Sequence, residues 1–75
     1  MNPAIDTRWC IQKGNLLFQF TIVGIWGNGF LNNYQVTDYE LKYDHMDKIQ
    51  RIPALKIKAL IEENQVRPIT DTNFQ

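Results

Sequence analysis

Five side chains near the middle of the chain carry the groups that metal binding or acid–base chemistry needs. They are Asp38, Glu40, Asp44, His45 and Asp47. Strand alternation would place Asp38 and Glu40 on one face, and two carboxylates beside a histidine can hold a divalent cation or act as acid and base. The same residues fit a turn aspartate, an exposed strand glutamate, a helix cap and a charge in the first helical turn. Because this second interpretation needs no ligand, we predict no metal site, no cofactor and no enzymatic activity.

Cys10 is the only cysteine, so the chain has no intramolecular disulfide. No motif places a base beside it, and we expect a small, buried or half-buried residue in a strand next to Trp9. A chain without disulfides suits a reducing compartment, which predicts a cytoplasmic location. Residues 1–8 lack the basic start of a signal peptide, and the apolar run Leu16–Trp26 is far shorter than the ~20 residues of a membrane helix.

The run Leu16–Trp26 changes its apolar pattern halfway along. As far as Ile22, apolar residues alternate with Gln19 and Thr21, as in a half-buried strand. From Ile22 to Trp26 no polar residue interrupts the run, so both faces of this end are expected to need cover. A chain of 75 residues has few other strands or helices with which to cover the second face of this strand. We therefore expect a partner protein, or a second copy of the chain, to cover it.

The first half of the chain is typical of antiparallel strands joined by tight turns. We expect strands at 8–13, with Trp9 and Ile11 on one face, at 16–26 and at 30–36. Turns at 14–15 and 27–29 are expected to join them, because glycine and asparagine tolerate positive φ. In the third strand Phe30, Tyr34 and Val36 are predicted to face the core. The parity of the apolar positions reverses at residues 37–38, which predicts a bulge or turn before Tyr39, Leu41 and Tyr43.

The second half is expected to be mainly helical. Asp44 is predicted to cap a short helix with Met46 and Ile49 on its apolar side. Pro53 either kinks this helix or begins a second one over Ala54–Asn64, where alanine, leucine, lysine and glutamate favour helix. An alternative takes residues 55–59 as an alternating strand. Residues 66–69 are predicted to form an edge strand, because Pro68 cannot donate to a ladder.

The predicted helix over Ala54–Asn64 has two apolar stripes. Ile52, Leu55 and Ala59, widened by Leu60, are predicted to face the core. Ile57 and Ile61 lie four residues apart on another side, where they are adjacent. We expect this second patch to be open to a partner.

Together these elements predict a single α+β domain over residues 8–69, between flexible tails at 1–7 and 70–75. The expected architecture is a small antiparallel sheet of three to four strands, a β-meander or an SH3-like barrel, followed by one or two C-terminal helices. A domain of this size buries only about 60 to 65% of its unfolded surface, so oligomerisation is a common source of stability. The size and character also fit a phage or mobile-element protein.

The predicted hairpin tip carries aromatic residues suited to binding. Trp26 and Phe30 flank it and Tyr34 follows, and rigid aromatic side chains often dominate binding energy. Alternatively, Trp26 and Phe30 form a cross-strand pair that covers the end of the sheet core. The predicted partner-binding residues are Trp26, Asn28, Phe30, Tyr34, Ile57 and Ile61.

The net charge of the chain helps to distinguish a protein-binding function from a nucleic-acid-binding one. The eight basic and eight acidic residues balance, which removes the broad positive field of non-specific nucleic-acid binders. We predict a non-catalytic protein-interaction module that binds a partner protein or itself, most simply as a homodimer. We do not expect it to bind a membrane. The alternative is a single-stranded nucleic-acid-binding module, with aromatic stacking and a basic helix surface from Lys48 to Lys58.

Overall fold

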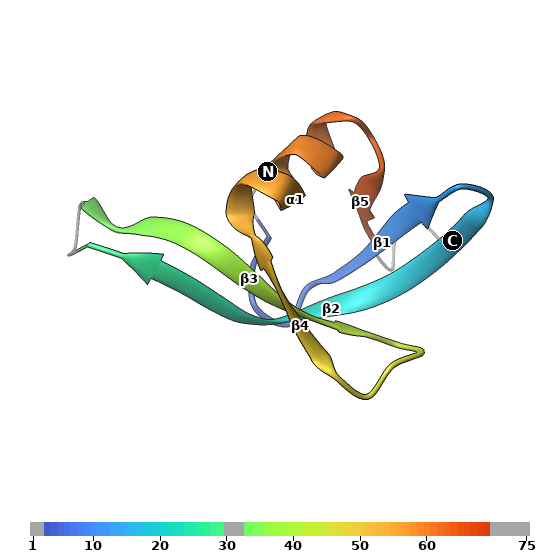
Figure 1. Cartoon of the computed structure of the whole chain (residues 1–75), viewed down its shortest axis with the longest axis horizontal. Coiled ribbons are helices and arrows are strands. Elements are labelled where there is room, and N and C mark those ends of the chain that lie inside the picture. The colour runs from blue at the N-terminus through green and yellow to red at the C-terminus, as the bar shows by residue number, and fades with distance from the viewer. Residues whose placement is uncertain (1–2, 30–32, 70–75) are drawn as a thin grey trace.

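A computed structural model describes residues 3–29 and 33–69. Over these residues the fold is α+β, with one five-stranded antiparallel sheet and one helix. The elements in chain order are β1 (Arg8–Lys13), β2 (Leu16–Asn28), β3 (Gln35–Tyr43), β4 (Ile49–Pro53), α1 (Ala54–Glu62) and β5 (Val66–Pro68). The sheet order is β4-β3-β2-β1-β5, so four strands follow one another and the fifth returns to pair with the first. The twisted sheet curves around α1, which covers its concave face (Figure 1).

The sheet has more strands than the three to four predicted, and α1 lies between β4 and β5 instead of at the C-terminal end. The short helix predicted after Asp44 is wrong, because the chain turns there and forms β4. Strand β4 pairs with β3, where Ile52 lies opposite Tyr39 on the core face. This pairing satisfies backbone groups of β3 that a helix would have left without partners.

A bulge at Val23 explains the uninterrupted apolar run of β2. Ile22 lies opposite Leu41 and Gly24 opposite Glu40, so Val23 is an extra residue without a cross-strand partner. The extra residue reverses the alternation of faces. Ile22 is fully buried, and Ile25 packs against the same core three residues later. The pattern that predicted two faces in need of cover thus reflects a change of parity, with apolar side chains before and after it on the core face.

The predicted parity change at residues 37–38 is confirmed as a bulge in β3. Trp26 lies opposite Asp38 and Gly27 opposite Val36, so Thr37 is the extra residue. The start of this strand differs from the prediction, because β3 begins at Gln35 and the side chain of Val36 is exposed. Tyr34, also predicted to face the core, is 50% exposed. Phe30 lies outside the described residues.

The core fills the space between the concave sheet face and α1. Its buried members are Trp9, Ile11, Phe20, Ile22, Tyr39, Leu41, Tyr43, Ile57 and Val66. The alternation of β1 and β2 is confirmed, since Trp9 and Ile11 share the buried face. The Trp9 indole N–H donates to the Thr7 hydroxyl at 2.9 Å, so its polar atom is satisfied inside the core.

Helix α1 begins directly after Pro53, which is extended with ψ of 141°, and its boundaries exclude the strand alternative for residues 55–59. Asn64, predicted to end the helix, has φ of +61°. The Asn64 and Gln65 amides donate to the carbonyls of Ile61 and Leu60, which satisfies the last turn. The predicted core face is wrong for Leu55 and Ala59, which are exposed, whereas Ile52 and Leu60 pack against the core as predicted. Ile57 is 1% exposed, whereas Leu55 is 81% exposed.

The remaining segments fasten the sheet at its edges. Residues 66–68 form the predicted edge strand, paired with β1. Asp6 and Thr7, which come directly before β1, form hydrogen bonds with β2. The amide of Asp6 donates to the Ile22 carbonyl, and the Ile22 amide donates to the Thr7 carbonyl. Pro3 is buried. In the described part of the chain, no helix has the length and apolar character needed to cross a membrane.

Candidate functional site

The β2–β3 hairpin extends beyond the rest of the molecule (Figure 1). Pairing with β1 ends where Arg8 lies opposite Thr21, and pairing with β4 ends where Pro53 lies opposite Asp38. Beyond these points β2 and β3 pair mainly with each other. We call residues 23–29 and 33–38 the arm. Its two faces carry different side chains, and each face is described in turn.

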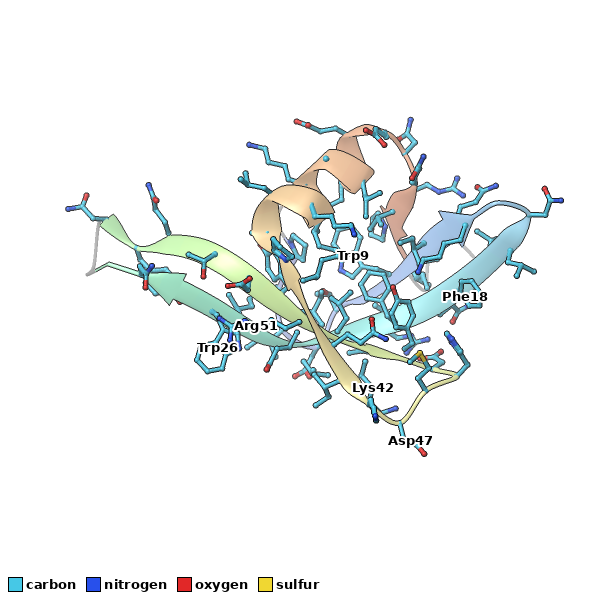
Figure 2. The ribbon with its side chains drawn as sticks, in the orientation of Figure 1. Trp9, Phe18, Trp26, Lys42, Asp47 and Arg51 are labelled. Atoms are coloured by element: carbon cyan, nitrogen blue, oxygen red, sulfur yellow. The ribbon has the colours of Figure 1, made fainter. Side chains whose placement is uncertain are left out.

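The convex face of the arm presents Trp26. Its side chain is 48% exposed, and the Arg51 guanidinium lies 4.6 Å from the centre of the indole ring (Figure 2). Arg51 also donates to the Asp38 carboxylate at 3.1 Å, and the Thr37 hydroxyl donates to the same oxygen at 2.9 Å. The Thr37 hydrogen bond and then Arg51 lower the pKa of Asp38 below its usual value. This arrangement orients an aromatic surface toward solvent.

The concave face of the arm forms one wall of a cleft against α1. The cleft has a volume of about 560 Å³, and its apolar lining includes Tyr34 and Val36 from the arm and Leu55 and Ile61 from the helix. The ring of Tyr34 lies against Gly27, where a side chain would occupy the same space. Two exposed apolar side chains of the arm thus face an exposed leucine of the helix across a hollow. Gln35 and Lys58 also line the cleft, so its surface is partly polar. A concave surface that combines apolar side chains with a few polar groups is typical of a binding site.

A second ion pair lies over the middle of the sheet, on its convex face. Arg8 holds Asp44 through two hydrogen bonds of 3.2 and 2.6 Å, and donates to Thr21 and Gln19 at 3.1 and 2.8 Å. The Arg8 hydrogen bond is the main reason that the pKa of Asp44 falls below its usual value. Asp44 therefore joins the start of β1 to the end of β3 and does not cap a helix.

These two ion pairs predict a specific dependence on pH. The pKa of each carboxyl is lower in the folded chain than in the unfolded chain, so each pair stabilises the fold above the unfolded pKa. The stabilisation is lost as pH falls through the folded pKa. In an NMR titration, Arg8→Ala is expected to raise the pKa of Asp44 toward its usual value and leave that of Asp38 unchanged. Arg51→Ala should do the reverse, and a variant that moves both or neither contradicts the assignment.

The residues considered for chemistry are dispersed. In residues 3–29 and 33–69, no group of three or more histidine, cysteine, aspartate or glutamate side chains is placed to hold a metal ion. His45 is exposed, with its ring 4.8 Å from that of Phe18 and 5.5 Å from that of Tyr43. Glu40 lies beside Gly24 on the convex face. Cys10 is half-buried, as predicted.

The structure separates the predicted partner-binding residues. Trp26 and Tyr34 are exposed on opposite faces of the arm, and Asn28 is exposed at its end. Ile57 is a core residue, so its predicted contact with a partner is wrong, whereas half-buried Ile61 lines the cleft. Phe30 lies outside the described residues.

Sequence reasoning missed three residues of these surfaces. Helical spacing predicts a core position for Leu55, and strand alternation predicts one for Val36. The predicted basic helix surface from Lys48 to Lys58 includes Arg51, although Arg51 lies in β4 beside Trp26. The apolar stripe that Leu55 forms with Ile52 and Ala59 at helical spacing is typical of a core face, so the sequence pattern gives Leu55 a core position.

The predicted basic helix surface from Lys48 to Lys58 is also wrong. Lys48 lies in the turn before β4 and Arg51 within that strand, and only Lys56 and Lys58 belong to α1. The four cations therefore come from three kinds of local structure and do not follow one helix.

The chain was compared with protein-family models, with curated proteins and with solved structures, and none of the three comparisons finds a match. The two faces of the arm are therefore the basis for a function.

Proposed function

We propose that the chain is a non-catalytic protein-interaction module that binds a partner protein or a second copy of itself through the arm. The observation that carries the proposal is the exposure of apolar side chains on both faces of a hairpin that extends from the domain. Trp26 is 48% exposed on one face, and Tyr34 is 50% exposed on the other. Exposed apolar surface of this kind on a small domain marks an interaction site.

Two features make the arm suitable for binding. The indole of Trp26 is held by Arg51, so an aromatic anchor is positioned before a partner arrives. Anchors that lose little conformational freedom contribute most to binding. The cleft on the other face is hollow and lined in part by apolar side chains, of which Leu55 on its helical side is 81% exposed. Burial of these side chains against a partner would supply the driving force.

The surrounding polar side chains support a structural use over a catalytic one. Asp38 and Asp44 are each held by an arginine. The Arg51–Asp38 pair joins the neighbouring strands β4 and β3, and the Arg8–Asp44 pair links β1 to the end of β3 across β2. Paired in this way, the carboxylates align β1, β3 and β4. We also propose the cytoplasm as the location of the chain, since its single cysteine is a free thiol.

Among the two architectures expected from the sequence, we propose the SH3-like one. A simple meander would end after β4, whereas here α1 carries the chain back so that β5 pairs antiparallel with β1. Architecture alone does not decide function, and the argument for binding depends on the arm.

Photo-cross-linking tests the proposal. The photo-reactive amino acid p-benzoylphenylalanine takes the place of Tyr34 in one variant and of Ile49 in a control. Ile49 is also apolar and 56% exposed, but it belongs to β4 and not to the arm. Irradiation in an extract of the source cells is expected to give adducts of one defined mass from the Tyr34 position only. The change Leu55→Glu, on the facing wall of the cleft, should reduce their yield at least severalfold.

Two results would contradict the proposal. Adducts in equal pattern and yield from both positions would show that capture at the arm is non-specific. An absence of adducts at the Tyr34 position, in variants that fold like the unmodified chain by circular dichroism, would show that the cleft meets no protein, and together with a monomeric solution mass it would contradict binding through either face of the arm.

A further inference from the structure

We propose that two copies of the chain pair antiparallel along the free edge of β2, with Trp26 on a two-fold axis, so that one sheet continues through both copies. This inference rests on the proposed function and names its partner as a second copy of the chain. It is carried by the backbone of the arm, and not by the cleft on its concave face.

Within residues 3–29 and 33–69, no backbone partner lies along the side of β2 that faces away from β3 after Ile22, and we call this side of residues 24–28 the free edge of β2. This edge lacks the features that normally prevent strand pairing. β4 carries Arg51 and ends at Pro53, and β5 has three residues and ends at Pro68. By contrast, residues 24–28 read Gly-Ile-Trp-Gly-Asn, without charge or proline, and the bulge of β2 precedes them at Val23. Strand edges are commonly protected by lysine, proline or a bulge, and an unprotected edge pairs with another strand.

The outward backbone groups of this edge follow from the hydrogen bonds that precede it. The Ile22 amide donates to the Thr7 carbonyl at 3.0 Å, and the Ile22 carbonyl accepts from the Asp6 amide at 2.8 Å. The backbone N–H and C=O groups of Ile22 therefore point away from β3. After the bulge, Gly24 lies opposite Glu40 of β3. Since backbone groups alternate along a strand, Ile25 and Gly27 present their N–H and C=O groups at the free edge.

With a two-fold axis between the two Trp26 residues, the outward N–H and C=O groups of Ile25 and Gly27 all form hydrogen bonds between the copies. This axis places Ile25 of one copy opposite Gly27 of the other, and Gly27 opposite Ile25. Each such pair exchanges two backbone hydrogen bonds. The two Trp26 residues then face each other as a pair without backbone hydrogen bonds, in which the Cα atoms approach to about 4.5 Å. Their indole rings meet on the convex face, where aromatic pairs stabilise a sheet.

The electrostatics of this edge also suit a second copy. Residues 24–28 carry no charge, so two identical edges meet without repulsion. The cation beside each indole belongs to Arg51, which is paired with Asp38. We therefore expect self-association to depend little on salt, since backbone hydrogen bonds and apolar contact drive it.

Solution mass across a thousand-fold dilution, at two salt concentrations, provides the first test. We expect a dimer that dissociates on dilution, with the same midpoint at both salt concentrations. The change Trp26→Lys should raise the dimer dissociation constant at least tenfold, because it places two like charges on the axis. The matched change Ile49→Lys introduces the same charge at another exposed apolar residue of the convex face and should leave the constant unchanged.

Disulfide cross-linking tests the register without relying on a destabilising change. In a Cys10→Ser background, Trp26→Cys places two thiols on the axis, where the expected Cα separation of about 4.5 Å allows a disulfide. Mild oxidation is expected to convert this variant into a covalent dimer. The variant Ile49→Cys in the same background should remain uncross-linked under the same conditions.

Three results would overturn self-pairing along β2: a monomer at every concentration, a dimer that Trp26→Lys does not weaken, or equal cross-linking of the two cysteine variants. If the chain is a monomer but Tyr34 still cross-links to another polypeptide, self-pairing fails and the proposed function stands. If the chain is a monomer and Tyr34 gives no adduct, both fail.

Discussion

Replacement of Ile57 by alanine is expected to lower the free energy of unfolding by about 2–5 kcal/mol, the usual loss when a buried isoleucine is truncated. Ile57 is 1% exposed and is the buried residue of α1, so its side chain connects the helix to the sheet. Small domains have a total stability of only about 5–15 kcal/mol. Urea unfolding, followed by tryptophan fluorescence and circular dichroism, measures the loss.

Leu55→Ala is the matched control for this change. Leu55 lies two residues away on the same helix and is 81% exposed, so its truncation is expected to change stability by no more than about 0.5 kcal/mol. Equal losses for the two variants, or a larger loss for Leu55, would show that the helix packs through its other apolar stripe. That result would restore Ile57 as a surface residue.

Replacement of Gly27 by alanine is expected to cost about 1–3 kcal/mol, the range for atoms added to a packed site. An added Cβ would meet the carbonyl oxygen of Gln35 across the hairpin and would lie 2.6 Å from the ring of Tyr34. The oxygen belongs to the backbone of the paired strand, so the contact is relieved only when the arm shifts. Thermal unfolding measures the cost, and the NMR signals of the Tyr34 ring report the displacement.

Gly24→Ala serves as the comparison, because its Cβ would meet the side chain of Glu40. The end of a glutamate side chain can rotate away, so we expect a smaller loss of stability and unchanged Tyr34 signals. If Gly27→Ala left both stability and the Tyr34 ring unchanged, Tyr34 would not be packed against β2. The concave wall of the cleft would then need a different description.

Local patterns predicted the parts of the fold that depend on neighbouring residues. The alternation of Trp9 and Ile11 located β1, and the parity change at residues 37–38 located the bulge at Thr37. The helical propensity after Pro53 and the stop at Asn64 located α1. Each signal lies within a few residues of the feature that it predicts, because turns, caps and alternation are local properties of the chain.

The candidate site was only partly predictable. The sequence predicts Trp26 and Tyr34 as partner-binding residues, although it also predicts Tyr34 to face the core. Nothing in the sequence shows that the two residues lie on opposite faces of one arm. Their separation follows from the bulges at Val23 and Thr37, which change the face that each residue occupies. The contact of Arg51 with Trp26 joins residues of two strands that are not neighbours in the sheet order.

The sequence by itself determined that the chain has alternating strands, a hairpin with an apolar end and a helix with two apolar stripes. Only the tertiary structure decided that residues 49–53 form a strand, because the free edge of β3 offers backbone partners to that segment. It also decided which stripe of α1 is buried. The helix leaves β4 at Pro53, and this entry point turns Ile57 toward the sheet and Leu55 toward solvent. Both outcomes depend on residues distant in sequence, since hydrogen bonding and packing act between whichever groups the fold brings together.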